Sequence, residues 1–374
     1  MNSLYTVNVC LGTPQQCMVL SLDTGDYWLW VLAKNCNPCH TAESKFNKDK
    51  SSSFYSDYQK VYVDFIDGFI FGYESYDYCK IGKAKTQKVK FCLATQDYEL
   101  DSFLADGGLG LSTGPGPNYY NYIESLYMSG FIENNIFSLY LNDNGFSDNQ
   151  PELSSVLMIG EYNLTYARIT EGARVLIDKP WEFSIDAVGY NNSIIKIQRN
   201  CILDSSESFI YGPMDDVVEL QKIFIKNYEC GFENHGFLTC KCYDLSFFKN
   251  IIVIVQGYIL EITPQSYMYE DEGNCYLLVV YKKNDVNPEW VLGMPFFREF
   301  YMIFNYSEPS VMFYPSVRSR EIPDRSESIR RWVIITIFTL GVVVVSVSLF
   351  IVYALYCKNP HRWLNTSVRN RAPN

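Results

Sequence analysis

The chain has 374 residues, a formal net charge of −11 and only three histidines, His40, His235 and His361. This length is enough for two medium lobes or one large β domain. The acidic charge argues against nucleic acid, which selects clustered lysine and arginine. A Ser–His or Cys–His mechanism is also disfavoured, because neither His40 nor His235 serves a recognisable nucleophile motif.

Strand-forming residues are abundant along the chain, which carries 30 tyrosines and 24 phenylalanines together with recurring runs of isoleucine and valine. Helical patterns are few, and the best of them are residues 122–128 and 215–226. A polar link at residues 142–151 precedes an apolar strand at residues 154–160. The composition therefore predicts an all-β fold with minor helices.

Two segments of the chain repeat one plan. Each copy is an apolar strand that ends in an aspartate followed by a hydroxyl residue: Met18–Asp23 with Thr24 and Gly25, and Ile202–Asp204 with Ser205 and Ser206. Downstream of each copy, two apolar or similar residues lead to a glycine, Gly110 at 87 residues from Asp23 and Gly293 at 89 residues from Asp204. The nearly equal spacing indicates two halves that arose by duplication and are related by a pseudo-twofold axis.

Twelve cysteines occur in the chain, and eleven of them precede residue 332. Several flank local turns, which predicts disulfides and an oxidising compartment: Cys10 with Cys17, Cys36 with Cys39, Cys79 with Cys92, and Cys240 or Cys242 with Cys275. Sequons at Asn163, Asn191 and Asn305 fit a glycoprotein. Zinc ligation by Cys36, Cys39, His40, Cys240 and Cys242 is the weaker alternative, because the two clusters lie far apart in sequence.

Residues 332–356 form an uncharged apolar run. At ~1.5 Å rise per residue this run spans a hydrocarbon core of ~30 Å, so we expect one transmembrane helix. Residues 316–331 would then be a juxtamembrane stalk, and residues 357–374 a short tail. Arginines lie on both sides of the run, so charge does not decide its orientation.

Cysteine usage favours a single-pass type I membrane protein whose folded domain is lumenal or extracellular, in the secretory or endolysosomal pathway. The folded part starts almost at Met1, so this interpretation requires a signal and a pro-segment that are missing from the sequence. The alternative is a tail-anchored protein with a cytosolic domain and reduced cysteines.

Motifs along the chain resemble those of pepsin-like aspartic proteases, in the order in which that family carries them. The segments that carry the resemblance are Tyr5–Gln15, Leu22–Val31, Asp106–Leu111, Ile136–Leu141, Ser208–Pro213 and Leu292–Pro315. The resemblance implies a bilobal double β-barrel, with Asp23 in an N-terminal lobe of residues 1–165 and Asp204 in a C-terminal lobe of residues 166–315. It also implies a monomer that acts on peptides or proteins without a cofactor or a metal.

The same resemblance implies an aspartic endopeptidase with Asp23 and Asp204 as the catalytic pair. Two adjacent carboxylates share one proton, so one activates a water and the other polarises the peptide carbonyl. Thr24, Gly25, Ser205 and Ser206 would support the pair. Phe65 falls where the family's flap has a tyrosine, and Trp30 where it has that tyrosine's partner. Tyr62 is the substitute if the register differs.

Three residues depart from the family pattern. Ser206 stands where the family has glycine, and its Cβ is expected to crowd the carboxylates. Asp26 replaces a hydroxyl residue that donates to the catalytic carboxylate, and an ionised aspartate there would repel it. Phe65 lacks the flap hydroxyl. These departures favour a second hypothesis, in which the chain keeps the fold as a peptide-binding or surface protein without turnover.

Overall fold

The computed structural model describes residues 4–317, apart from gaps at 66–67, 85, 101–102, 115, 117–120, 143–153, 178–180, 192, 233–236, 243 and 282–288. Residues Met1–Ser319 form one compact unit, and Arg320–Asn374 form a second. The transmembrane segment expected at 332–356, most of the stalk and the tail therefore lie outside the described residues. Within the described residues, no helix has the length and apolar character needed to cross a membrane.

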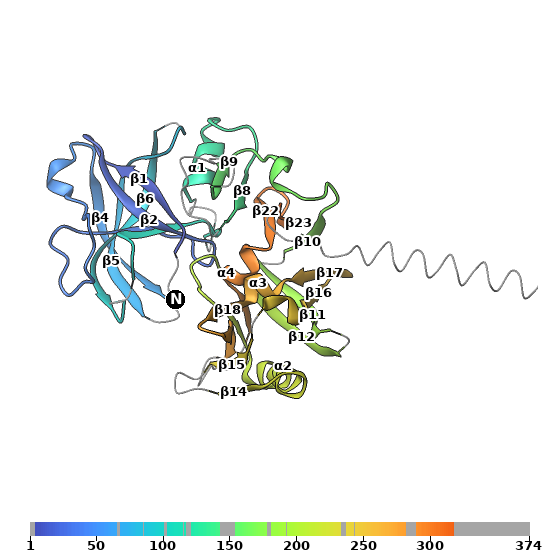
Figure 1. Cartoon of the computed structure of the whole chain (residues 1–374). Coiled ribbons are helices and arrows are strands. Elements are labelled where there is room, and N and C mark those ends of the chain that lie inside the picture. Colours follow the sequence, from blue (N-terminus) through green and yellow to red (C-terminus); the bar gives the residue numbers. More distant parts are fainter. Residues whose placement is uncertain are drawn as a thin grey trace, which may run out of the picture. The chain divides into compact units, whose positions relative to one another are not determined.

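A seven-stranded sheet is built from the first third of the chain, in the order β1-β2-β7-β3-β6-β5-β4 (Figure 1). Its strands are β1 (Thr6–Leu11), β2 (Gln16–Asp23), β3 (Leu29–Leu32), β4 (Tyr55–Asp64), β5 (Phe69–Ile81), β6 (Gln87–Tyr98) and β7 (Gly107–Gly110). The long hairpin of β4 and β5 alternates exposed and buried residues near its tip, as a strand with one buried face does.

A second seven-stranded sheet lies in the C-terminal half, in the order β17-β16-β11-β12-β21-β13-β20. Its strands are β11 (Glu182–Tyr190), β12 (Ser193–Leu203), β13 (Ile210–Gly212), β16 (Ile251–Val255), β17 (Tyr258–Ile262), β20 (Val279–Tyr281) and β21 (Trp290–Leu292). A four-stranded sheet accompanies it in the order β14-β15-β19-β18, with β14 (Cys230–Phe232), β15 (Leu238–Lys241), β18 (Met268–Asp271) and β19 (Asn274–Leu277).

A five-stranded sheet joins the two halves, because β22 from the end of the fold pairs with β8 from the first half (Figure 1). Its order is β10-β23-β22-β8-β9, with β8 (Ile136–Tyr140), β9 (Val156–Ile159), β10 (Ala173–Leu176), β22 (Phe300–Asn305) and β23 (Ser310–Pro315). Phe137 and Phe304 stack on this sheet with ring centroids 4.4 Å apart, and Trp181 packs edge-on against both. The halves therefore share one aromatic core.

Helices are few among the residues that the structure describes, as the sequence predicts. They are α1 (Tyr122–Met128), α2 (Met214–Asn227), α3 (Pro264–Tyr267) and α4 (Met294–Phe297), with 3-10 turns η1 (Lys48–Lys50), η3 (Leu164–Tyr166) and η4 (Leu245–Phe247). Both expected helices are confirmed. Asn121 and Glu124 form a capping box at the start of α1, which satisfies main-chain N–H groups that the helix leaves unpaired. The mostly β, two-lobed architecture agrees with the sequence-based expectation.

The described residues contain four disulfides: Cys10–Cys17, Cys36–Cys39, Cys230–Cys240 and Cys242–Cys275. The first two were expected. Cys240 and Cys242 were both considered as partners of Cys275, and Cys242 is the one that pairs with it. The partner of Cys240 is Cys230, which faces it across the β14–β15 hairpin and was missed in the sequence. Because Cys36, Cys39, Cys240 and Cys242 are all oxidised, the structure does not support zinc ligation.

The expected Cys79–Cys92 bridge is wrong. Both thiols are free and buried. In the β5–β6 register Cys92 lies opposite Glu74, whereas Cys79 lies opposite Gln87. Five residues of offset along a strand correspond to about 16 Å, and a disulfide needs Cα atoms within ~7 Å. Antiparallel pairing fixed a register that the turn at Gly82 alone did not reveal.

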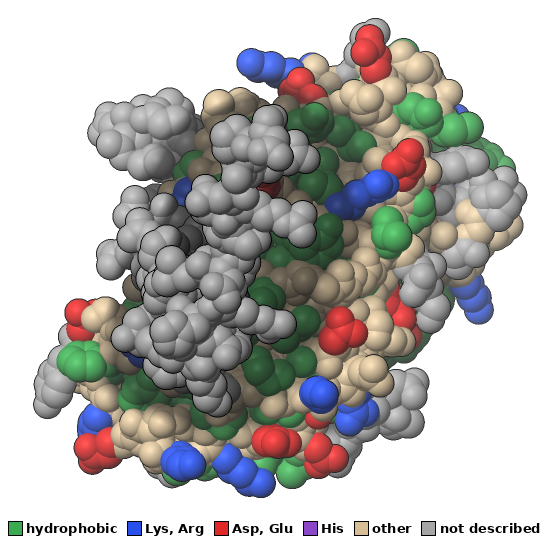
Figure 2. Space-filling model, turned by 90° about the vertical axis from the view of Figure 1, so that its right-hand side faces the viewer, with side chains coloured by type: hydrophobic (Ala, Val, Ile, Leu, Met, Phe, Trp, Pro, Cys, Tyr) green, Lys and Arg blue, Asp and Glu red, His purple; other side chains and the backbone are tan. Residues whose placement is uncertain are grey.

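Acidic and basic side chains are interspersed near the rim of the face in Figure 2, and hydrophobic side chains gather toward its middle. On the described part of that face, charged side chains of both signs are therefore spread rather than collected into one patch.

Candidate active site

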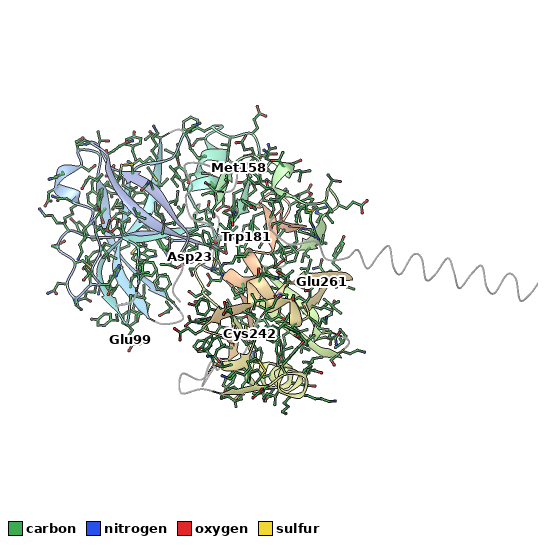
Figure 3. The ribbon with its side chains drawn as sticks, in the orientation of Figure 1. Asp23, Glu99, Met158, Trp181, Cys242 and Glu261 are labelled. Atoms are coloured by element: carbon green, nitrogen blue, oxygen red, sulfur yellow. A yellow bond between two sulfur atoms is a disulfide. The ribbon has the colours of Figure 1, made fainter. Side chains whose placement is uncertain are left out.

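Both repeated motifs have the same local structure. β2 runs parallel to β7 with Asp23 opposite Gly110, and β12 runs parallel to β21 with Leu203 opposite Leu292. Each aspartate stands at the end of its strand, beside a downstream Leu-Gly segment. The 87- and 89-residue spacings in the sequence thus correspond to two equivalent strand pairs. Figure 3 labels Asp23 where the N-terminal strands meet the C-terminal half.

Reciprocal hydrogen bonds join the two strand ends. The Thr24 hydroxyl donates to the Leu203 carbonyl at 2.8 Å and accepts from the Ser205 N–H at 3.0 Å. The Ser205 hydroxyl donates to the Leu22 carbonyl at 2.8 Å and accepts from the Thr24 N–H at 3.1 Å. All four bonds are buried. A hydroxyl directly after each aspartate therefore locks the two motifs together with twofold symmetry.

The two carboxyl groups lie at this junction. Asp23 is 4 % exposed, and its Oδ1 accepts from the N–H groups of Gly25 at 2.9 Å and Asp26 at 3.0 Å. Asp204 reaches the backbone of the opposite loop so closely that a Cβ on Gly25 would lie 2.4 Å from its Oδ2. Only glycine fits there.

Electrostatics favour the protonated form of Asp23. Burial raises the pKa of Asp23 well above its ordinary value, and the neighbouring carboxylates of Asp204 and Asp26 raise it further. Hydrogen bonds from the Asp26 and Gly25 N–H groups oppose this shift. Two carboxyl groups in such contact titrate as a pair that retains one proton over a wide pH range.

Ser206 takes part in the site instead of disrupting it. Its N–H and its hydroxyl both donate to Asp204 Oδ1, at 2.9 and 2.7 Å. The serine thus gives Asp204 a hydroxyl donor, and the expected crowding of the carboxylates is wrong for Asp204. The structural reason is that the side chain folds back onto its own loop.

Asp26 gives no such donor to Asp23. Its Oδ1 accepts from the N–H groups of Tyr27 and Trp28, the latter at 3.1 Å. Burial raises its pKa to about 6, and the charge of Asp204 contributes in the same direction. Near neutral pH, Asp26 therefore places a third carboxylate beside the pair.

Phe65 lies beside Trp30, with ring centroids 5.7 Å apart. It lies on the same side of the β4–β5 hairpin as Val61 and Val63, which pack with Trp30 in one apolar cluster. Tyr62 points to the other side, where it is 55 % exposed and stacks on Phe69. Phe65, and not Tyr62, is therefore the residue beside Trp30.

Because Phe65 has no hydroxyl, its ring offers no hydrogen-bond acceptor to the neighbouring Trp30. The Trp30 Nε1 is buried and has no hydrogen-bond partner among the described residues. An unpaired buried N–H costs free energy that a hydroxyl on the neighbouring ring would recover.

A cavity of about 120 Å³ opens beside Asp23. Its lining combines aromatic and aliphatic side chains with serines and two glutamates: Leu4, Ser21, Asp23, Trp30, Phe65, Glu99, Leu100, Phe103, Ser206, Glu207, Ser208, Phe209 and Tyr211. Both halves of the chain contribute, and Phe65, which follows β4, is part of the lining. An apolar cleft with a few convergent polar groups is the usual form of a ligand site.

Sequence reasoning missed two supports of the site. The hydroxyls of Thr24 and Ser205 were expected to assist, but not to cross-link the lobes. The Leu111 carbonyl, next to the Asp23 strand, accepts from Trp181 Nε1 at 3.0 Å and from the Tyr306 hydroxyl at 2.6 Å. The hydroxyl residue after each aspartate could have predicted the cross-link, whereas no sequence pattern pointed to Trp181 or Tyr306.

Comparison with known proteins identifies the family. The profile of the eukaryotic aspartyl protease family matches residues 4–315. The chain belongs to this family. Its relatives include pregnancy-associated glycoprotein 2 of Bos taurus, 26 % identical over 327 residues and covering 85 % of this chain and 83 % of the relative.

Two further relatives match at similar identity. Pepsin A of Sus scrofa is 25 % identical over 328 residues, which is 83 % of this chain and 81 % of the relative. Chymosin of Bos taurus is 24 % identical over 316 residues, covering 82 % and 79 %.

Proposed function

We propose that the chain is an aspartic endopeptidase that hydrolyses peptide bonds with a water activated by Asp23 and Asp204. In this proposal residues 1–165 carry the first aspartate and residues 166–315 the second. The observation that supports it is the contact of the two motifs through Thr24 and Ser205, with the Asp204 carboxyl group close to Gly25 and an open cavity beside Asp23. Membership of the family supports the same assignment.

The mechanism follows from the environments of the two groups. Burial favours the shared proton on Asp23, and two donors from Ser206 favour the ionised form of Asp204. Asp204 then takes a proton from water as the water attacks the peptide carbonyl, while Asp23 donates to the carbonyl oxygen. The proton held by Asp204 next passes to the leaving nitrogen as the C–N bond breaks, and a hydroxyl of the diol intermediate returns its proton to Asp23. Thr24, Gly25, Ser205 and Ser206 hold the two groups in place.

A peptide library tests the assignment. The full chain in detergent is assayed with fluorogenic peptides from pH 3 to 7, beside Asp23→Asn and Asp204→Asn. We expect cleavage in the acidic range, and each substitution should lower kcat by about 10³-fold, because one partner of the proton transfer is lost. Cleavage that survives either substitution would overturn the role of the pair.

The second candidate is a peptide-binding or surface protein that has lost turnover. The observations in its favour are the third carboxylate at Asp26 and the unpaired Trp30 Nε1 behind Phe65. It requires that a folded protein binds peptides at the cavity but cleaves none of the library. Unchanged binding by Asp23→Asn and Asp204→Asn would support it.

We further propose that residues 332–356 anchor the chain in a membrane with the protease domain on the lumenal or extracellular side. The uncharged run in the sequence supports the anchor, and four disulfides support the oxidising side. Sequon residues Asn163 and Asn191 are exposed. We expect retention in alkaline-washed membranes and a mass shift with glycosidase. Release by the wash would contradict the anchor, and a protease-accessible domain in sealed cytosolic-side-out vesicles would contradict the orientation.

A further inference from the structure

His40 is a buried histidine that the proposed mechanism does not use. Its side chain is 0 % exposed. The ring Nδ1 lies 2.6 Å from Asp97 Oδ2, and the ring Nε2 lies 2.9 Å from the Ala105 carbonyl oxygen. The main-chain N–H of His40 also donates to both oxygens of Asp97, at 2.9 and 3.2 Å. Both ring nitrogens therefore face oxygen atoms.

Counting donors fixes the protons of this pair. A carbonyl only accepts, so Nε2 carries a hydrogen toward Ala105. The contact between Nδ1 and Asp97 then needs a second hydrogen, since two lone pairs would otherwise face each other at 2.6 Å. Because both oxygens of Asp97 accept from the main chain of His40, the carboxylate is best satisfied when ionised. An imidazolium paired with a carboxylate satisfies all of these contacts.

This pair ties two segments together beside the cavity. His40 follows the Cys36–Cys39 disulfide, and Asp97 lies near the end of β6. His40 contacts Asp97 and the Ala105 carbonyl, and three residues that lie between them in sequence are here called the cleft wall: Glu99, Leu100 and Phe103. All three line the cavity, and Figure 3 labels Glu99 at the lower edge of the lobe.

The rings of the cavity rest directly on His40. Phe103 meets it edge-on with centroids 5.4 Å apart, and Trp30 does so at 6.5 Å. The backbone just before the wall also lies close to Gly68, which directly precedes β5, because a Cβ on Gly68 would lie 2.2 Å from the Tyr98 carbonyl oxygen. A shift of the cleft wall would therefore displace side chains of the cavity and the neighbouring end of β5.

Few other charges surround the pair. Asp106, at the start of β7, is buried and accepts from the N–H groups of Ser44 and Val19. Glu43, on the loop of His40, and Glu99, in the wall, are exposed. Asp97 is thus the carboxylate in direct contact with the ring among the described residues.

We propose that His40, held as an imidazolium by Asp97, is a positioning residue that sets the cleft wall for substrate. It touches no reacting atom and acts through Leu100 and Phe103. The kinetic part of this inference rests on the proposed protease function. Removing the imidazole would leave the buried Asp97 carboxylate and Ala105 carbonyl without their ring partner, so the wall depends on the two ring contacts of His40.

Two variants test separately whether KM depends on the position of the cleft wall and on the charge of His40. His40→Leu removes both ring hydrogen bonds, and we expect KM to rise at least about 5-fold with kcat within about 2-fold, since binding in the cleft is lost and the dyad is untouched. Asp97→Asn is the matched control. Its amide can donate to a neutral Nδ1 while Nε2–H still reaches Ala105, so KM should stay within about 2-fold of the wild-type value.

Nuclear magnetic resonance of the full chain, with 15N in its histidines, reads the protons directly. At pH 5 we expect both His40 nitrogens to be protonated, and only one in Asp97→Asn. An unprotonated Nδ1 in the wild-type protein would overturn the imidazolium. If His40→Leu folds and keeps the wild-type KM, the positioning role is wrong.

Two alternative experiments apply where His40→Leu does not fold or where the wild-type protein cleaves no peptide. Where His40→Leu does not fold, His40→Gln is used; it reaches Asp97 but loses Ala105, and a KM equal to the wild-type value would count against the inference. Where the wild-type protein cleaves nothing, the dissociation constant of a non-cleavable peptide with a secondary alcohol at the scissile position replaces KM. Failure of the protease function and failure of the inference are then separate results.

Discussion

Asp26 is the residue at which this site departs most from a simple pair of carboxylates. It donates its main-chain N–H to Asp23 and uses its own carboxylate to accept from Tyr27 and Trp28. Its pKa is raised to about 6, chiefly by burial. The folded protein therefore binds a proton here that the unfolded chain releases. This contribution favours folding below the unfolded pKa near 4 and is lost as the pH rises through about 6.

Asp26→Asn removes this charge and keeps the oxygen that accepts from Tyr27 and Trp28. Because the charge of Asp26 raises the pKa of Asp23, we expect the alkaline limb of the kcat/KM profile to move to lower pH. The free energy of unfolding of the variant relative to wild type should increase by about 1 kcal/mol from pH 4 to pH 7, less than full linkage because the side chain is partly exposed. Parallel pH profiles for the two proteins would contradict this.

Phe65 and Trp30 form the second residue-scale departure. Phe65→Tyr adds a hydroxyl to the ring that lies beside the unpaired Trp30 Nε1. An acceptor for this N–H should hold the flap closer to the cleft, so we expect kcat/KM to rise by about 2- to 5-fold, as one modest hydrogen bond provides. Steady-state kinetics measure it. Phe65→Leu is the control that lacks both ring and hydroxyl, and an equal kcat/KM in the Tyr and Leu variants would refute the role of the hydroxyl.

At the scale of elements, the ends of β2 and β12 hold the site. β2 ends in Asp23 and β12 is followed directly by Asp204, and the residue after each aspartate donates to a carbonyl of the other strand. These bonds connect residues about 180 positions apart, so they form only when both halves have folded. The arrangement explains why a hydroxyl follows both Asp23 and Asp204.

Thr24→Val tests this element. Valine has the shape of threonine but neither donates to the Leu203 carbonyl nor accepts from the Ser205 N–H. Two buried groups lose their partner, so we expect the free energy of unfolding to fall by about 2–4 kcal/mol. Denaturant unfolding measures the loss. Thr24→Ser keeps the hydroxyl and should lose less than about 1 kcal/mol; equal losses in the two variants would argue for packing instead.

At the scale of the molecule, the five-stranded sheet makes the halves one folding unit. Tyr306, which follows β22, donates to the Leu111 carbonyl and accepts from Asn121 Nδ2 at 2.9 Å. Leu111 in turn donates its N–H to the Asp23 carbonyl at 2.7 Å. The shared core therefore supports the N-terminal aspartate from the C-terminal end of the chain.

Tyr306→Phe removes the hydroxyl and leaves the ring that packs on Phe137 and Trp181. Leu111 keeps its bond from Trp181, and Asn121 keeps its bond to Ser112. We therefore expect a modest loss of about 1–2 kcal/mol in the free energy of unfolding, with a single cooperative transition. Two separate transitions would show that the halves unfold independently and that the shared core does not couple them.

Local pattern was enough for much of this protein. Short stretches of sequence were enough to predict the strand composition, the helices at 122–128 and 215–226 and the two aspartate motifs. Their residue period and spacing can be recognised without the rest of the chain. The turn cysteines at 10 and 17 and at 36 and 39 pair for the same reason, since their partners are close in sequence.

Only the tertiary structure decided what depends on distant partners. Register across β5 and β6 separated Cys79 from Cys92, and the folding of Ser206 onto its own loop gave Asp204 a hydroxyl donor. The links of Thr24 to Ser205 and of His40 to Asp97 join residues 181 and 57 positions apart. No single stretch of sequence encodes such contacts, because each is set by where packing brings two elements together.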